Sequence, residues 1–365
     1  MDKITILKSF LNRGAQLDKG VLDLLATDDN ILNQVLKIEE NKLPPVITNK
    51  FLKSLSPNIK LTEDYKKLSI NQLSKIVVDR YEFIKSLLVY RKELVNLISI
   101  NRISEKIKQF SVIGAVSDIN DVLTLEDPTG SDTFIINREL AKTIVEDEII
   151  GIVCERQSGT NDVNYIVYPD IPLKRENNKT ESLENYFFIS DMNMDSPDFN
   201  QNYYKNLINW LKKQKNLKIF ILGGVSSRKE DITKLLSDIH HPVELYSEES
   251  ITSSPAIIQI ENLQILLTHG LFLDHYNKLW GTPPDITIMN LLRKRNLNPI
   301  LTPWSYNNSF LLADIPDIIV MGGVNKSTSA NYKGTTILTN GSFKTEPAYW
   351  LINLQTRETF KIDFS

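Results

Sequence analysis

Two apolar strands joined through a glycine-rich turn lie near the end of the sequence. The first covers residues 317–321, a turn with two consecutive glycines follows it, and the second covers residues 333–339 and ends in the turn 340–342. An apolar strand that brings a glycine turn to the rim of a sheet is a common setting for a phosphate or metal site. The sequence therefore predicts a buried sheet with a candidate site beside this turn.

Strands and helices alternate from residue 185 onward. Apolar strands are expected at 186–191, 217–224, 256–260, 263–270 and 317–323. Helices are expected near 203–214, 229–239 and 286–295, where apolar residues recur at three- and four-residue steps. This order is typical of a layered α/β sandwich whose site lies at the strand ends.

A run of short strands precedes the sandwich. They are expected at 110–119, 122–127, 131–137, 148–154 and 164–169, with a helix at 138–145 between the third and the fourth. This is the element order of an OB-fold barrel. Such barrels bind single strands with aromatic side chains and a basic groove. Residues 101–180 instead carry a net charge of -5 and few aromatic residues, which favours a protein-contact or structural role and leaves direct strand contact open.

The N-terminal hundred residues are expected to be mainly helical. Apolar spacing predicts three short helices within residues 1–40, and Thr27, followed by two aspartates, suits a helix N-terminus. These helices either pack on the body of the protein or form a partner-docking domain. A long helix is expected at 69–94. The predicted segments are 1–40 (helical domain), 41–68 (linker), 69–98 (helix leading into the barrel), 99–172 (barrel), 173–184 (linker) and 185–365 (sandwich).

Composition limits the possible function classes. A chain of 365 residues should hold two or three domains, and its apolar runs are too short to span a bilayer. The first residues carry charges where a signal peptide needs an apolar core, so a cytoplasmic location is expected. Cys154 is the single cysteine, which excludes an internal disulfide and a cysteine-based zinc cluster. The net charges of residues 1–100, 101–180 and 181–365 are +4, -5 and -2, which disfavours a free-standing DNA-binding protein.

Several motifs match one family in content and order. They are GGVN at 322–325, YKGTT at 332–336 and NGS at 340–342, with LEDPTG at 125–130, DEIIG at 147–151 and YPDIP at 168–172 in the barrel region. The sequence resembles the calcineurin-like metallophosphoesterases, and in particular the small subunit of archaeal DNA polymerase D, also called DNA polymerase II small subunit. The resemblance implies an α+β multidomain protein with an N-terminal helical bundle, an OB-fold β-barrel and a calcineurin-like metallophosphoesterase α/β sandwich.

The metal-binding motifs of that family are degenerate in this chain. The first, Asp-x-His, is Asp191-Met192-Asn193, and the second, Gly-Asp, is Gly223-Gly224. The third has no counterpart, the fourth survives as His269-Gly270, and the fifth has Gly323 and Asn325 in place of two histidines. Two metal ligands remain, so we expect no bound metal and no catalytic residue. The degenerate site is predicted to comprise Asp191, Asn193, Gly224, His269, Gly323 and Asn325.

These residues and their neighbours also suit other roles. Asp191 at a strand end suits a turn cap, and His269 suits a hydrogen-bonded position at the sheet rim. A single-metal site could combine both with Asp195, Asp274 and His275, although no spacing demands it. The run GGVNKS at 322–327 lacks the glycine spacing of a phosphate loop. The His240-His241 pair is expected at a helix end, where a cationic imidazole complements the helix dipole.

The resemblance implies an accessory subunit that binds and stabilises the large catalytic subunit of DNA polymerase D in DNA replication. It implies contact with DNA mainly through the complex, leaves contact with a sliding clamp open, and implies no membrane association. The alternative is a metal-dependent 3′-5′ exonuclease that uses Mn²⁺ or Mg²⁺ at a reduced site around Asp191 and His269. A strand-binding module is the third hypothesis.

Overall fold

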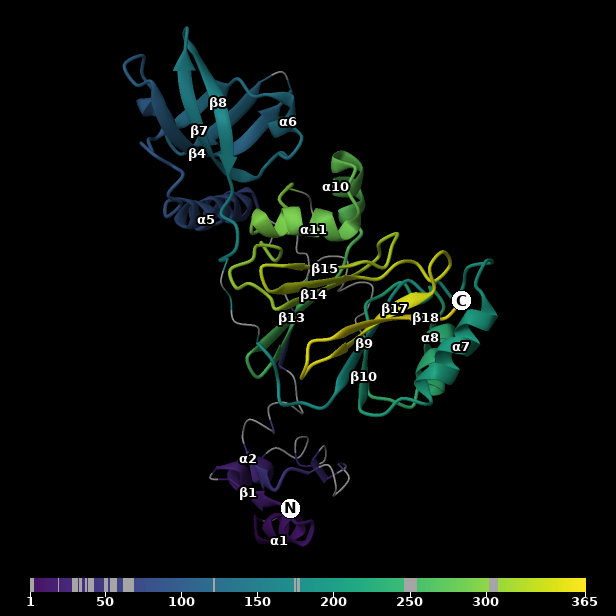
Figure 1. Ribbon diagram of the computed structural model, residues 1–365. Coiled ribbons are helices and arrows are strands. Elements are labelled where there is room, and N and C mark those ends of the chain that lie inside the picture. The colour runs from purple at the N-terminus through teal and green to yellow at the C-terminus, as the bar shows by residue number, and fades with distance from the viewer. Residues whose placement is uncertain are drawn as a thin grey trace.

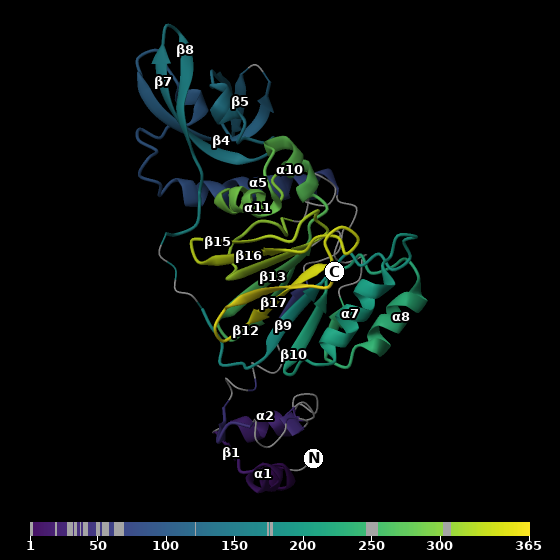
Figure 2. The same cartoon turned by 45° about the vertical axis from the view of Figure 1, so that its right-hand side comes forward.

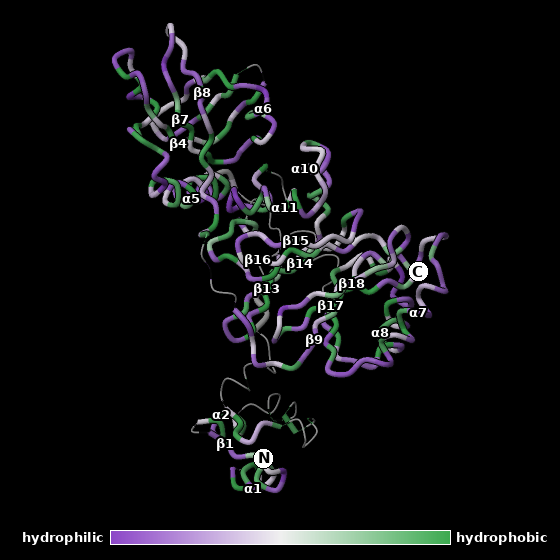
Figure 3. Tube along the Cα trace, viewed as in Figure 1, coloured by the Kyte–Doolittle hydropathy of each residue, from purple (hydrophilic) through white to green (hydrophobic). Residues whose placement is uncertain are grey.

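The chain forms three parts in the computed structural model (Figure 1). An N-terminal helical part lies at one end, the five-stranded sheet formed by residues 109–167 lies at the other, and two stacked sheets of five and six strands lie between them. Figure 3 shows apolar residues along much of the buried strands and polar residues along much of the connecting loops. The structure describes residues 3–18, 20–27, 32, 35, 36, 38, 43–48, 52, 58–61, 69–120, 122–173, 175, 178–245, 255–301 and 308–365.

The N-terminal part includes, within the residues that the structure describes, the following two helices and two very short parallel strands. These are α1 (Lys3–Asn12), β1 (Gln16–Leu17), α2 (Val21–Thr27) and β2 (Val46–Ile47). The helices pack through fully buried residues such as Ile6 and Phe10. Two of the three predicted helices are confirmed, and most of the third lies outside the described residues. Thr27 was expected to begin a helix but is the last residue of α2, where its hydroxyl donates to main-chain carbonyls one turn back.

Two strands lie among the described residues of the predicted linker 41–68. One is β2, and the other is β3 (Asn58–Leu61), which pairs antiparallel with β12 (Ala256–Ile260). Ile59 lies opposite Ile258, and the partner strands are almost 200 residues apart in sequence. Four residues carry little periodicity, so this long-range pairing could not be predicted locally.

The five-stranded sheet has the predicted element order. Its order is β6-β5-β4-β7-β8, and an isolated parallel bridge between Ile135 and Asp162 brings the ends of the sheet together. Core residues such as Phe110 and Ile152 lie on the inner face, and α5 packs on the outer face through residues such as Ile84. The elements are α5 (Ile70–Leu88), the 3-10 helix η2 (Ile100–Arg102), β4 (Gln109–Ile119), β5 (Leu123–Asp127), β6 (Gly130–Phe134), α6 (Arg138–Ala141), β7 (Ile149–Gln157) and β8 (Thr160–Val167).

Two stacked sheets, covered by helices on both outer faces, form the largest part (Figure 2). Alternate side chains of each strand point to opposite faces: Phe188 packs between the sheets, whereas Phe187 packs under α7 and α8. The first sheet has the order β11-β10-β9-β17-β18 and the second β15-β16-β14-β13-β12-β3. Helices α10 and α11 cover the second sheet through a separate buried cluster.

The elements of the sandwich match most of the predicted segments. Those not predicted individually are α10, β11, β15, β17 and β18, all of eight residues or fewer. The elements are β9 (Asn185–Ile189), α7 (Gln201–Leu211), β10 (Leu217–Ile221), α8 (Lys229–Asp238), β11 (Val243–Leu245), β12, β13 (Leu263–His269), α10 (Leu273–Trp280), α11 (Pro284–Arg293), β14 (Ile318–Gly322), β15 (Ser329–Tyr332), β16 (Thr335–Thr339), β17 (Ala348–Asn353) and β18 (Thr359–Asp363).

A buried polar contact joins the five-stranded sheet to the sandwich. The Lys294 ammonium lies 2.5 Å from a Glu148 carboxylate oxygen and donates to the main-chain carbonyl of Thr143 at 2.7 Å. Both charged side chains are almost fully buried, with 4% and 2% exposure. Lys333 adds a second ion pair with Asp170 at 2.6 Å. These contacts fix the two units against each other.

Candidate functional site

The surviving motif residues converge where the central strands of both sheets end. Asp191 follows β9, Gly224 follows β10, His269 ends β13, and Gly323 follows β14. Strands β9 and β10 run parallel in one sheet, as do β13 and β14 in the other, so their carboxyl ends lie at the same edge. The structure thus brings together four of the six residues of the predicted degenerate site.

Asp191 and His269 form a direct pair across the two sheets. His269 Nε2 donates to Asp191 Oδ1 at 3.0 Å, and the main-chain N–H of Gly323 donates to Asp191 Oδ2. The side chains are 14% and 9% exposed, so the pair is largely removed from water. Both carboxylate oxygens of Asp191 therefore have a hydrogen-bond donor within the protein.

The two glycines leave no room for the side chains expected by the family motif. A β-carbon on Gly224 would lie 2.5 Å from Asp191 Oδ1, and one on Gly323 would lie 2.2 Å from Cε1 of His269. Both glycines have a left-handed backbone, with φ of 62° and 69°. Residues with a β-carbon adopt this conformation at a cost, and the contacts add a steric penalty. The retained pair occupies the space that other ligands would need.

The two asparagines of the predicted site do not act on the Asp191 carboxylate. The Asn193 amide donates to the main-chain carbonyl of Asp191 at 3.0 Å, and its own N–H donates to Gly224 O at 2.8 Å. Asn193 therefore holds the loop after β9. Asn325 is exposed on the turn after β14.

The additional acidic and histidine candidates are not assembled with the pair. Asp195 Oδ2 accepts hydrogen bonds from the Ser227 hydroxyl and main-chain N–H, and these bonds lower the pKa of Asp195. Asp274 and His275 are exposed on α10, where the His275 ring lies edge-on to Tyr276. Within the described ranges no three His, Cys, Asp or Glu side chains are grouped in a way that could hold a metal ion.

Two buried polar residues behind the pair support it: Asn340 belongs to the NGS motif, whereas no motif marks Tyr349. The Tyr349 hydroxyl donates to the Ser190 carbonyl at 2.5 Å, and the Asn340 amide donates to the Phe188 carbonyl at 2.9 Å. Burial, and next the nearby charge of Asp191, raises the pKa of Tyr349 well above its ordinary value. Tyr349 therefore remains a neutral donor that fixes the strand immediately before Asp191.

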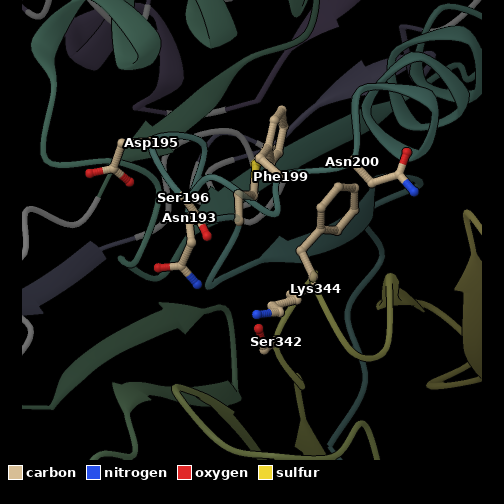
Figure 4. Close-up of a pocket in the computed structure, with 9 residues that line it drawn as sticks. Asn193, Asp195, Ser196, Phe199, Asn200, Ser342 and Lys344 are labelled. Atoms are coloured by element: carbon tan, nitrogen blue, oxygen red, sulfur yellow. The ribbon is translucent and has the colours of Figure 1, made fainter.

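A cavity of about 270 Å³ lies next to the loop that follows Asp191 (Figure 4). In Figure 4 the side chains of Asn193 and Lys344 face each other, with Ser342 next to Lys344. Neither Asp191 nor His269 lines this cavity. Its walls come from the loop after β9, the beginning of α7 and the turn after β16, and are formed by Met192, Asn193, Asp195, Ser196, Phe199, Asn200, Ser342, Phe343 and Lys344.

Two further sequence motifs have structural contacts. His241 follows α8, and its Nε2 lies 2.7 Å from the main-chain carbonyl of Leu211. In the turn after β14, the Ser327 N–H donates to Glu346 and its hydroxyl donates to the Ala348 carbonyl. Both segments are thus held by hydrogen bonds within the chain.

Among the described residues no helix combines the length and apolar content needed to cross a membrane.

Comparison with known proteins identifies one group of relatives. No family model matches the sequence. The chain is 22% identical to the DNA polymerase II small subunit of Archaeoglobus fulgidus, over 96% of this chain and 93% of that protein. It is 20% identical to the protein of the same name from Thermoplasma acidophilum, over 96% and 88%, and 22% identical to that of Methanothermobacter thermautotrophicus, over 74% and 72%.

Solved structures match only part of the chain. Vps29 of Entamoeba histolytica in complex with zinc aligns with a TM-score of 0.32 and 15% identity, over 50% of this chain and 99% of that one. The similarity to the DNA polymerase II small subunits extends much further. The resemblance predicted from the sequence motifs is confirmed: over nearly its whole length, this chain is similar to the DNA polymerase II small subunits.

Proposed function

We propose that this chain is the accessory small subunit of a replicative DNA polymerase and that it binds and stabilises the large catalytic subunit. The observation that carries this proposal is the similarity to DNA polymerase II small subunits over 96% of the chain. We further propose that the chain contacts DNA mainly through the complex and that the complex works in the cytoplasm.

Co-expression with the large subunit of the same organism tests the accessory role. The two chains should co-purify in size-exclusion chromatography as one complex, and the large subunit should be less soluble when it is expressed alone. Two folded proteins that elute separately would contradict the proposal.

We propose OB-fold and calcineurin-like phosphoesterase identities for the two larger parts. The order β6-β5-β4-β7-β8, with α6 between the third and fourth strands, supports the first. Two stacked sheets with helices on both outer faces, and the pairing of Asp191 with His269 where the central strands end, support the second. The N-terminal part is proposed to be a small helical domain.

We also propose that the site around Asp191 and His269 binds no pair of divalent cations. A two-metal phosphoesterase needs several carboxylates and imidazoles around ions about 3.5 to 4 Å apart. Here one carboxylate and one imidazole bind each other, and no room remains at Gly224 or Gly323 for further ligands. The residues present do not fit such a centre, so no catalytic step is assigned to it.

A metal-dependent exonuclease remains the alternative, because Asp191 and His269 are both retained and lie together. Isothermal titration with Mn²⁺, combined with digestion of a mismatched primer, distinguishes the two. We expect no stoichiometric binding and no release of nucleotides, with Asp191→Ala indistinguishable from wild type. Manganese binding and digestion that both disappear in Asp191→Ala would establish the alternative.

A further inference from the structure

Charge is unevenly distributed within the five-stranded unit. Residues 89–108 contain five Lys or Arg against two Asp or Glu, whereas residues 109–170 contain three against twelve. The net charge of the whole unit conceals this separation. One short basic segment therefore borders a strongly acidic sheet.

The same segment exposes several apolar side chains. Val89, Tyr90, Val95 and Leu97 are 43%, 85%, 50% and 38% exposed, and Tyr165 of β8 is 42% exposed. We define the collar as residues 89–97 together with Lys108 and Tyr165. A cluster of this kind on an otherwise charged surface is typical of an interaction site.

Buried contacts hold the collar in place on the outer face of the sheet. Leu94 is 8% exposed and lies against Gly151, where a β-carbon would come within 2.9 Å of its side chain. The Tyr165 hydroxyl donates to the Glu93 carbonyl at 3.2 Å, and the Ser111 hydroxyl donates to the Val95 carbonyl at 2.7 Å. The exposed side chains are thus presented from a fixed backbone, which lowers the entropy cost of binding.

The chemistry of the collar favours a protein segment over a nucleic acid. Three of its five exposed apolar side chains, Val89, Val95 and Leu97, are aliphatic and cannot stack on bases, whereas all five can pack against apolar side chains. Lys92 and Lys108 are exposed, and within the described part of the chain neither forms an ion pair. A complementary partner therefore combines apolar with acidic residues.

We propose that the collar binds an acidic, apolar segment of the large polymerase subunit. This inference rests on the proposed function, because it names the surface that the accessory role requires. The acidic remainder of the sheet repels the same segment, which restricts binding to the collar and sets its orientation.

Two full-length variants test the collar against a matched control. Tyr90→Ser combined with Val95→Ser removes apolar area, and Lys92→Glu combined with Lys108→Glu reverses charge. Leu183→Ser combined with Leu279→Ser changes two side chains that are 60% and 53% exposed outside the collar. Circular dichroism and thermal unfolding establish that each variant is folded.

Affinity for the purified large subunit is then measured by surface plasmon resonance at two salt concentrations. Both collar variants should bind at least ten-fold more weakly than wild type, the charge variant should lose salt dependence, and the control should be unchanged. Wild-type affinity in both collar variants would overturn the inference while the accessory role stands. Failure of the wild-type chain to bind would overturn both.

A labelled single-stranded oligonucleotide provides the remaining comparison. We expect weak binding that the collar variants do not change. If these variants instead lose affinity for the oligonucleotide and keep full affinity for the large subunit, the collar is a nucleic-acid surface and the proposal is wrong.

Discussion

At Gly323 the backbone has a φ of 69°, and a β-carbon there would lie 2.2 Å from the His269 ring. The absence of a side chain at this position and the hydrogen bond between His269 and Asp191 are thus two aspects of one arrangement. A histidine could return to this position only if the imidazole of His269 moved. The degenerate motifs are therefore compatible with one another in space, which the sequence alone does not reveal.

Gly323→Ala should lower the free energy of unfolding by about 2 to 3 kcal/mol, because it combines a left-handed backbone with a steric clash. Gly159→Ala is the matched control, since Gly159 has a φ of 91° and no atom lies within 4 Å of its added β-carbon. The control should lose only the backbone contribution of about 1 kcal/mol. Urea unfolding measures both, and equal losses would contradict the predicted clash.

At the scale of elements, the sequence predicts strands and helices that carry their own apolar periodicity. Strands β9, β10, β13 and β14 are continuous buried runs, and α5 begins at a capping box formed by Ser69 and Gln72. Strand β3 was missed because only its pairing with β12 defines it.

In the candidate site too, the sequence predicts residues but not the long-range contacts between them. The identities of Asp191 and His269 follow from the motifs, whereas their mutual hydrogen bond depends on how two sheets meet. Tyr349 carries no motif at all, and its role depends on the position of the Ser190 carbonyl. Local sequence patterns therefore identify residues of the candidate site, but they do not define the contacts between those residues.

The turn between β5 and β6 yields a pH-dependent prediction. Burial opposes ionisation of Asp127, but hydrogen bonds from Thr129, Ile100 and Gly130 lower its pKa below the ordinary value of 3.8. A carboxylate with a lowered pKa stabilises the fold above its unfolded-state pKa, and this contribution disappears as the pH falls through the folded-state pKa.

Asp127→Asn should therefore lower the free energy of unfolding by about 1 kcal/mol at pH 7, since the side chain is partly exposed, and by much less near pH 2. Urea unfolding at both pH values measures the difference. Glu126→Gln, one residue earlier, is the control and should show no comparable loss. A loss that is the same at both pH values would contradict the role of the charge.

At the scale of the whole molecule, the buried contact between Lys294 and Glu148 joins the five-stranded unit to the sandwich. Burial raises the pKa of Glu148, and although burial also opposes the charge on Lys294, the Glu148 carboxylate raises the pKa of that ammonium. The rings of Tyr168 and Trp280 lie within 4.3 and 5.5 Å of the same ammonium. Residues of both units thus surround a single buried cation.

Lys294→Met should cost about 3 to 5 kcal/mol, because it leaves the Glu148 carboxylate buried without its cation. The double variant Lys294→Met with Glu148→Leu should recover a large part of this loss, since no unpaired charge remains. Guanidinium unfolding measures both. A double variant that is as unstable as the single one would show that the penalty does not arise from the unpaired carboxylate.

Strand β3 also limits the distance between the N-terminal part and the sandwich. Eleven Cα steps separate Ile47 of β2 from Asn58 of β3, and a fully extended chain of that length reaches about 40 Å. Because β3 pairs with β12, Ile47 must lie within about 40 Å of Asn58 at the edge of the sandwich. A partner that binds the N-terminal part next to β2 would therefore be held near that edge of the sandwich.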